Sequence, residues 1–570
     1  MECTLTKRYA RLCPDALVAL WLGVWWVANL VQAGFSELAN DEAYYHMFAE
    51  HLAWGYFDHP PVTALLVWAG EHLFGGELGV RFFFTVLQPL YLWVLWRLVR
   101  PSDATRRDAA LYVMIAAATL MLQLYGFLAV PDGPLLFSTA LFLAAFRRFA
   151  DGRPRAWLWM GLAMALMAYS KYHGALVVVF VLAANPRQLL RPTLYLSGAV
   201  ALALLVPHLV WQYHHDWASF AYHLSGRNSV FRPGYVAEFL GNMLVVFNPF
   251  FVPLYIQAWR KTRPQTPVGR ALKFLPVAFI VFFLLSALRG YVQPQWVIVA
   301  AFGLVCVLFD YARRHPRTRR YVLRAGAVTL VLVAAVRAEM LFNPLGLRFE
   351  VFDNKPHYGA IADVAAGRPV IFRGGYAVAA KYAFYTGGEA YCQPNITYRT
   401  HQWQFRDDDT RFIGREVLVE CPLEGADSAL HVESVTLPTG KRFSWFVDRS
   451  FHPVRRVDIS FEGLPERVTP GEELRLELRI TNPYPYEIRV GEGDTRLALL
   501  WKHGRFRVDA FPLDERFTIP AGGELTRSVT FAVAPQLAGE RFDVGFALQR
   551  TGYANWFNGK PLPTEVSSQP

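Results

Sequence analysis

Cysteine is scarce in this chain. The 570 residues include five cysteines, and none of them shows the close spacing of a zinc-binding module: Cys3, Cys13, Cys306, Cys392 and Cys421. The sequence therefore predicts no structural metal site. Cys392 and Cys421 are the only two in the hydrophilic C-terminal part, where they can pair if that part lies in an oxidising compartment.

A signal-peptide cleavage site is also missing. Lys7, Arg8 and Arg11 precede an apolar run at 16–31, as in a secretory signal. However, the run is long and rich in tryptophan, and no small-residue cleavage site follows it. We therefore predict that residues 16–31 are retained as a first membrane span.

Charged residues make up only 18% of the chain, against 54% apolar and 15% aromatic residues, and the mean hydropathy is +0.21. The apolar residues are concentrated in blocks that are long enough to span a membrane or nearly so. We count about eleven such spans. They lie near 16–33, 80–99, 109–125, 134–149, 157–170, 174–184, 193–211, 236–257, 272–288, 296–311 and 324–342.

The net charge of +11 and the pI of about 9.4 are compatible with nucleic-acid binding. In a membrane protein, basic loops on the cytoplasmic side explain the same excess. With about eleven spans, all the basic clusters fall on the side of the N-terminus, which we therefore place in the cytoplasm of a plasma (inner) membrane protein. The clusters are Arg97, Arg100, Arg106 and Arg107; Arg147, Arg148, Arg153 and Arg155; Arg187 and Arg191; Arg260, Lys261, Arg263 and Arg270; and Arg313, Arg314, Arg317, Arg319 and Arg320.

After residue 344 the composition becomes that of a soluble protein, which we expect on the extracytoplasmic side. Residues 345–452 mix short apolar strands with a helical patch at 376–385, as in a small α/β domain. Residues 453–570 alternate apolar and polar positions between Gly-rich turns, as in a β-sandwich. The predicted domains are thus a membrane domain at 1–344 and these two extracytoplasmic domains.

The first extracytoplasmic loop, 34–79, contains the most polar stretch between spans, ELANDEAYYHMFAEHLAWGYFDHPP at 37–61. Asn40 is a suitable N-cap for a helix at 41–53 along the membrane surface. Asp41 and Glu42 would then lie in its first turn, where carboxylates stabilise a helix even without a catalytic role. His59 is either an ordinary interfacial residue or a cation near a phosphate.

Four shorter polar segments fall on the same side of the membrane, and each also has a structural interpretation. Asp132 lies in a Pro-Asp-Gly turn. Lys171 ends a span on the side where basic residues are rare, as a snorkelling lysine does. The segment 213–217, YHHDW, fits an interfacial belt better than a metal site, and Arg289 opens a short turn.

The location of these residues on one membrane face is more informative than any single one. Acids can accept a proton from a hydroxyl, and Lys, His and Arg can hold a phosphate, so the set suits a lipid-phosphate donor whose tail lies in the bilayer. A transporter would instead carry ionisable residues near the midplane and an internal repeat. The chain shows no such repeat.

The segments DEAYY (41–45), WGYFDHPP (54–61), PDGPLL (131–136), SKY (170–172) and HDWASF (215–220) resemble a known family. They are similar to the bacterial polyprenyl-phosphate-sugar glycosyltransferases of the GT-C superfamily, which include relatives of protein O-mannosyltransferases and the lipid A aminoarabinose transferase. The resemblance covers about residues 10–345. It implies a multi-span enzyme with its catalytic acid in the first extracytoplasmic loop.

The resemblance also implies roles for individual residues. Asp41 matches the general base, Glu42 its neighbour, and Asp132 the second extracytoplasmic aspartate. Lys171 matches a lysine at the end of the corresponding span. His59 stands where the aminoarabinose transferases have a lysine near the carrier phosphate, and this departure leaves the phosphate contact open because histidine is only partly charged at neutral pH.

We therefore expect a glycosyltransferase that takes a sugar from a polyprenyl phosphate, with inversion, to a lipid, glycan or protein acceptor. Asp41, Glu42 and Asp132 are the catalytic candidates, and His59, Lys171 and Arg289 the phosphate-binding ones. The sequence establishes no cofactor; a divalent metal is compatible with it, although no ligand cluster demands one. The alternatives are a translocator or binding protein for lipid-linked sugar, and a polymerase or ligase with a lipid diphosphate donor. Nucleic acid is not an expected partner.

Overall fold

The computed structural model describes residues 13–224, 231–423, 430–504 and 506–568. The chain divides into two compact units, with the division between Phe352 and Asp353. Lys7, Arg8 and Arg11, which the sequence places before the first span, lie outside the described residues, as does part of the loop 212–235.

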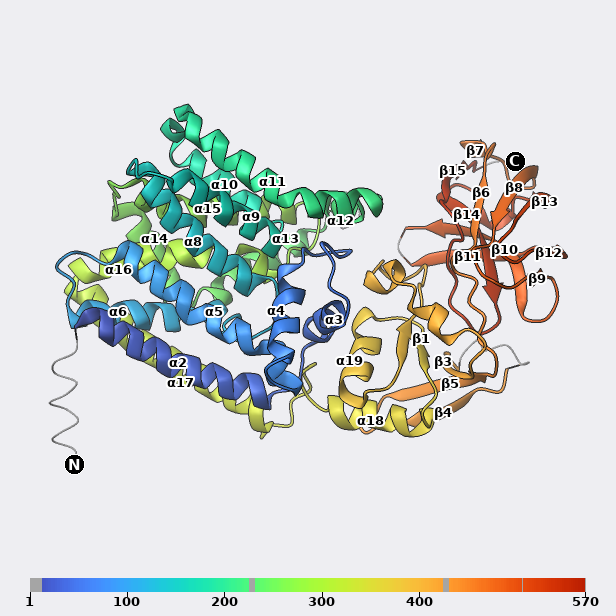
Figure 1. The fold of residues 1–570 in the computed structure, drawn as a ribbon, viewed down its shortest axis with the longest axis horizontal. Coiled ribbons are helices and arrows are strands. Elements are labelled where there is room, and N and C mark those ends of the chain that lie inside the picture. The colour runs from blue at the N-terminus through green and yellow to red at the C-terminus, as the bar shows by residue number, and fades with distance from the viewer. Residues whose placement is uncertain (1–12, 225–230, 424–429, 505, 569–570) are drawn as a thin grey trace. The chain divides into compact units, whose positions relative to one another are not determined.

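The first unit is helical (Figure 1). Its α-helices are α2 (Pro14–Phe35), α3 (Asn40–Ala49), α4 (Val62–Glu71), α5 (Gly76–Val99), α6 (Arg106–Ala117), α7 (Leu120–Leu124), α8 (Asp132–Ala150), α9 (Ala156–Ser170), α10 (Gly174–Ala183), α11 (Pro192–His214), α12 (Ala218–Leu224), α13 (Pro233–Val246), α14 (Val252–Lys261), α15 (Pro267–Ala287), α16 (Ala300–Arg314) and α17 (Pro316–Phe342). Two short 3-10 helices, η1 (Pro186–Leu190) and η2 (Pro294–Val297), join them.

Among the described residues, five helices are long and apolar enough to cross a membrane: α2, α5, α11, α15 and α17. Three further apolar helices, α4, α9 and α10, are shorter. The prediction of a multi-pass helical membrane protein is confirmed in this form, whereas the count of about eleven spans is not.

One expected span, 236–257, is broken into α13 and α14. Asn248 adopts a left-handed backbone conformation with φ 75°, and Pro249 follows it. The Asn248 side chain is fully buried; its amide nitrogen donates to the Ala118 carbonyl and to Thr329, at 3.0 and 2.9 Å. The break is therefore held by hydrogen bonds that composition alone does not reveal.

The bundle packs around a large apolar core to which most of its helices contribute. Neighbouring pairs include α2 with α5, α5 with α8, α8 with α9 and α9 with α11, and α2 and α17 run side by side. Figure 1 shows α3 and α4 at one end of this unit and α6 and α16 at the other. Asp41 and Glu42, on α3, and His59, in the connection between α3 and α4, belong to the end that carries these two helices.

The second unit begins with an α/β part. Its elements are α18 (Asn354–Ala365), β1 (Val370–Phe372), α19 (Tyr376–Thr386), β2 (Ala390–Cys392), η3 (Gln402–Phe405), η4 (Asp408–Phe412), β3 (Val417–Glu420), β4 (Glu433–Thr436) and β5 (Arg442–Asp448). The strands form one sheet in the order β2-β1-β3-β5-β4, with β1 parallel to both β2 and β3.

A β-sandwich follows. Its elements are β6 (Asp458–Phe461), β7 (Arg467–Val468), β8 (Glu473–Thr481), β9 (Ile488–Val490), β10 (Thr495–His503), β11 (Arg507–Pro512), β12 (Phe517–Ile519), β13 (Glu524–Ala532), η5 (Pro535–Leu537), β14 (Arg541–Arg550) and β15 (Leu562–Val566). The sheets run β11-β10-β14-β15-β7 and β13-β8-β6, with a short β12-β9 pair. Alternate residues of β8 are buried, as the period of two in the sequence predicts.

Strand β10 is buried on both faces because it serves two cores. Leu497, Leu499 and Trp501 point into the sandwich. Ala498 and Leu500 pack instead with Ile396 from the α/β part. The two parts of the second unit therefore share apolar packing across β10.

Cys392 and Cys421 are both free thiols, so the disulfide considered from the sequence is not formed. Cys392 lies on β2 with its sulfur 3.6 Å from Nε2 of His401. His401 is fully buried, and burial together with the nearby Arg399 and Arg455 lowers its pKa to about 3.

This histidine makes stability depend on pH. In the unfolded chain His401 binds a proton below a pKa of about 6.5, whereas in the folded unit it stays neutral down to about 3, so its contribution to the free energy of unfolding falls as the pH drops through this window. At pH 5 we expect a loss of about 2 kcal/mol relative to pH 8.

Glu420 acts in the opposite direction, since burial raises its pKa. The measurement is therefore the difference between the wild type and His401→Gln. We would follow the urea concentration at which residues 353–570 of the full chain become protease-sensitive at pH 8 and pH 5. Equal pH dependence in both proteins would contradict the assignment.

Candidate active site

Helix α3 begins one residue earlier than expected, at Asn40, and ends at Ala49. Asn40 is not its N-cap: the cap is Ala39, and the Asn40 amide donates to Glu350 at 2.6 Å. The Glu42 carboxylate reaches back to accept from the Ala39 backbone N–H at 2.9 Å. A carboxylate at the third helical position thus performs the capping that we predicted for Asn40.

Glu42 also makes a buried ion pair with Arg81 of α5. Both side chains are fully buried, and Nε of Arg81 donates to Oε1 of Glu42 at 2.6 Å while an Nη group donates to Oε2. The Ala129 backbone N–H donates to the same carboxylate at 2.8 Å. Every oxygen of Glu42 therefore has a donor, which is the condition for keeping a charge inside a bundle.

Arg81 extends this pair to the end of α2. Its guanidinium donates to the carbonyls of Ala33, Ser36 and Glu37 at 3.1, 2.6 and 2.9 Å. Because α2 ends at Phe35, these carbonyls lack helical partners, and Arg81 satisfies them. One residue thus joins α2, the connection to α3, and α5.

Asp41, the neighbour of Glu42, is half-buried on the same first turn of α3. It lies close enough to Asp132 and Tyr125 for its charge to act on both. The structure therefore brings together Asp41 and Asp132, which the sequence separates widely.

Asp132 is buried in the first turn of α8 and pairs with Lys171, which follows the end of α9. Nζ of Lys171 donates to Oδ1 of Asp132 at 2.7 Å. An acid at a helix N-terminus and a base at a helix C-terminus are both placed favourably in the fields of their helices. The lysine is therefore buried and directed at a carboxylate, which the snorkelling interpretation does not require.

The loop 50–61 is tied to α11 by hydrogen bonds. Nδ1 of His208 lies 2.7 Å from the Trp54 carbonyl, which can only accept, so this nitrogen carries the proton. Nε2 of the neutral ring then accepts from the Tyr172 hydroxyl at 3.2 Å. Gly55 fits here because a Cβ would come within 2.6 Å of Trp211.

Two further residues complete the attachment. Gln212 donates to the Tyr172 hydroxyl at 3.1 Å and to Ser219 at 2.7 Å, and Ser219 donates to the Tyr56 carbonyl at 2.8 Å. This network fixes the loop against the turn that contains Lys171.

His59 is half-buried in that loop, with its ring 5.4 Å from Tyr45 and 6.4 Å from His223, centroid to centroid. His223 is in turn 5.3 Å from the ring of Tyr172, the residue after Lys171. His59 is therefore on the same side of the bundle as the Asp132–Lys171 pair.

Arg289 is exposed after α15, and within the described residues no hydrogen bond or ion pair joins its side chain to the other five candidates. In the part of the chain that the structure describes, no three His, Cys, Asp or Glu side chains gather as metal ligands would. The candidate site consists of carboxylates, a lysine and aromatic and imidazole rings.

Sequence reasoning missed Arg81, His208 and Gln212. For Arg81 a signal exists, because an arginine inside an apolar run needs a buried partner. His208 and Gln212 lie within an apolar run as well, and neutral polar residues there are too common to be singled out.

Residues 58–211 match the family model described as dolichyl-phosphate-mannose-protein mannosyltransferase. Among solved structures, ArnT from Cupriavidus metallidurans in the apo state is 15% identical with a TM-score of 0.58, over 75% of this chain and 97% of that one. ArnT from the same organism bound to undecaprenyl phosphate is 17% identical with a TM-score of 0.57, over the same shares. No curated protein sequence matches the chain.

Both likenesses are to glycosyltransferases, and the resemblance inferred from DEAYY and the later motifs is confirmed. The chain has the fold of ArnT, and five of its described helices are long and apolar enough to cross a membrane.

The two adjacent carboxylates of α3 provide a matched test of stability. Glu42→Gln leaves the Arg81 charge buried without a counter-ion, which costs about 3–5 kcal/mol for a buried pair. Asp41→Asn removes the same charge from a half-buried position in the same helical turn and should lower the melting temperature much less, because a first-turn carboxylate contributes about 0.3–1 kcal/mol. Thermal unfolding of both purified full-length variants checks this, and equal melting temperatures would refute the structural role of Glu42.

Proposed function

We propose that this protein is a membrane glycosyltransferase that moves a sugar from a polyprenyl-phosphate donor to an acceptor hydroxyl with inversion. The observation that carries the proposal is a half-buried Asp41, fixed by Glu42 and Arg81, beside a buried Asp132–Lys171 pair. The family signature at 58–211 and the ArnT fold, which in one structure is bound to undecaprenyl phosphate, support it.

In this mechanism Asp41 is the general base. The acceptor oxygen attacks the anomeric carbon, its proton passes to a carboxylate oxygen of Asp41, and the bond from the anomeric carbon to the phosphate oxygen breaks. The electron pair of that bond leaves with the polyprenyl phosphate. Attack opposite the leaving group inverts the anomeric centre. A positioned base of this kind contributes about 10²- to 10⁴-fold to the rate.

The leaving phosphate gains one negative charge in this step, and cations stabilise it. Lys171 carries this role, supported by His59 and by Arg289 when the donor is bound. Asp132 is a positioning residue, because its ion pair directs the ammonium group of Lys171. Glu42 is likewise a positioning residue for Asp41.

If the protein were a translocator, ionisable side chains would be expected along the whole path of the substrate across the membrane. The middle third of each of the five long apolar helices contains no Asp, Glu, Lys or Arg. This distribution favours chemistry at one face of the membrane over passage through it.

The proposal includes about eleven spans; α9 and α10 are among the shorter ones, whereas α4 belongs to the first extracytoplasmic loop, 34–79. The N-terminus lies in the cytoplasm and the domains 345–452 and 453–570 lie outside it, with the membrane domain at 1–344 in the plasma (inner) membrane. The basic loops support this orientation. The acceptor is a lipid, a glycan or a protein.

Asp41→Asn tests the chemistry. We expect transfer to fall at least 10²-fold, because the variant keeps the size of the side chain but cannot take up a proton. The measurement is mass spectrometry of envelope lipids and glycoproteins from cells with the wild type, the variant or no gene. A folded Asp41→Asn protein with full transfer would exclude Asp41 as the base.

Single cysteines test the orientation. In a background with Cys3 and Cys13 changed to serine, Ser450→Cys should react with a membrane-impermeant maleimide on intact spheroplasts. Ser102→Cys, at a position that is also exposed, should react only after lysis. The reverse pattern would overturn the proposed topology.

A further inference from the structure

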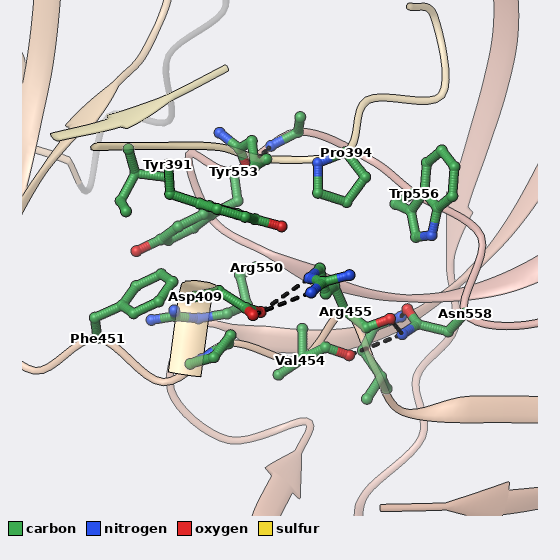
Figure 2. Close-up of a pocket in the computed structure, with 15 residues that line it drawn as sticks. Tyr391, Pro394, Asp409, Phe451, Val454, Arg455, Arg550, Tyr553, Trp556 and Asn558 are labelled. Carbon is green, nitrogen blue, oxygen red and sulfur yellow. Dashed lines mark hydrogen bonds and ion pairs between the residues drawn. The ribbon is translucent and has the colours of Figure 1, made fainter. Parts of the chain in front are cut away.

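The second unit contains a cavity of about 60 Å³ between its α/β part and its β-sandwich. Tyr391 on β2, Pro394 after it, the segment 451–455 and the connection after β14 line it. In Figure 2, Tyr391, Pro394 and Trp556 lie along one side, and the Asp409–Arg455 pair and Asn558 along the other. Nothing in the mechanism above uses this cavity.

The charges at the cavity are already compensated by the protein. Arg455 donates to both oxygens of Asp409, at 2.9 and 3.1 Å, and to two backbone carbonyls. Arg550 donates to Asp494 and Asp448, at 2.7 and 3.0 Å. A charged ligand would have to compete with these pairs, so the lining favours a neutral one.

The other polar groups at the cavity that matter for a ligand are the neutral side chains of Tyr391 and Gln393. The Tyr391 hydroxyl is buried and has no hydrogen-bond partner among the described residues. Gln393 accepts from the Ala554 backbone N–H at 3.1 Å, which leaves its buried amide nitrogen without a partner in the described chain. A hydroxyl and an amide N–H are groups that pair with hydroxyl or amide oxygens of a ligand.

Aromatic and proline rings supply the rest of the lining. Trp556 and Tyr553 are half-buried, and Phe451 and Pro394 are buried beside them. Flat apolar surfaces next to neutral hydrogen-bonding groups match a pyranose ring, which has apolar C–H faces and hydroxyl edges. The cavity is larger than a water needs and smaller than a typical site of about 300–1,000 Å³, so it admits part of one ring.

We propose that this cavity is a subsite for one neutral sugar residue of a glycan. The inference rests on the proposed function in one respect: the glycan is then the acceptor, held by the second unit. Trp556 stacks on a face of the ring, and the Tyr391 hydroxyl and Gln393 amide bind its substituents.

Binding is tested on the full chain in lipid nanodiscs, because glucoside and maltoside detergents carry sugar headgroups. The probes are the methyl glycosides of glucose, mannose and galactose and N-acetylglucosamine, with glucuronic acid and glucosamine as charged comparators. We expect at least one neutral probe to bind with a Kd of about 1 mM, as suits one small ring. The charged probes should bind at least tenfold more weakly.

Two variants test the residues. Tyr391→Phe removes one hydroxyl and should weaken binding about 3- to 10-fold, and Trp556→Ala should weaken it about tenfold or more. Tyr382→Phe is the matched control, since Tyr382 is a buried tyrosine of the same unit that does not line the cavity. Protease resistance of each variant checks folding.

The proposal is overturned if no neutral probe binds, if charged probes bind equally, or if Tyr391→Phe and Trp556→Ala bind like the wild type. A cavity that holds buried water only gives the first of these results. Asp41→Asn should retain full binding, so failure of the catalytic assignment is distinguishable from failure of the subsite. In cells, Trp556→Ala should lower the amount of sugar transferred while Tyr382→Phe does not; equal transfer would exclude the acceptor role.

Discussion

The arrangement at the end of the helical unit that carries α3 and α4 depends on the buried ion pair between Glu42 and Arg81. Arg81 satisfies the carbonyls at the end of α2, and Glu42 caps α3 and accepts from the segment before α8. The hydrogen bonds of these two side chains therefore connect four segments: the end of α2, the start of α3, α5 and the segment before α8. A buried pair is weak evidence for stability by itself, but here each hydrogen bond also ends or begins a helix.

This pair gives two neighbouring carboxylates different surroundings, on which the different roles proposed for them rest. Glu42 has donors at both oxygens and is fully buried, so it has no capacity left for a substrate. Asp41 is half-buried one residue away, on a helix whose first turn the pair holds in place. The resemblance to the GT-C family singles out Asp41, and the geometry supplies a physical reason for the same choice.

Much of this architecture is predictable from the sequence because periodicity and composition report on burial. The alternation in β8 and the apolar runs of α2 and α17 predict a sheet and membrane helices, which the structure contains. Helix ends were predicted less well: Asn40 was expected to cap α3, and 236–257 was expected to be one span. In both cases the hydrogen bonds of one side chain decide the outcome: Glu42 accepts from Ala39 at the start of α3, and Asn248 donates to Thr329 between α13 and α14.

In the candidate site, too, some features were predictable from the sequence and others depend on contacts that the sequence does not reveal. Loop charges and motifs predicted that Asp41, Asp132 and Lys171 share one membrane face, and the structure places these three residues near one another. The residues that hold the surrounding segments in place, Arg81, His208 and Gln212, were not predicted, because their roles consist of contacts between segments that are distant in the sequence. Lys171 is an example. The sequence makes it a phosphate-binding candidate, and the structure adds that its ammonium group is directed by Asp132, with Nζ 2.7 Å from Oδ1. Asp132 accepts from one of the three N–H donors of Lys171, so a donor phosphate can bind the same cation, whose position is set before the donor arrives.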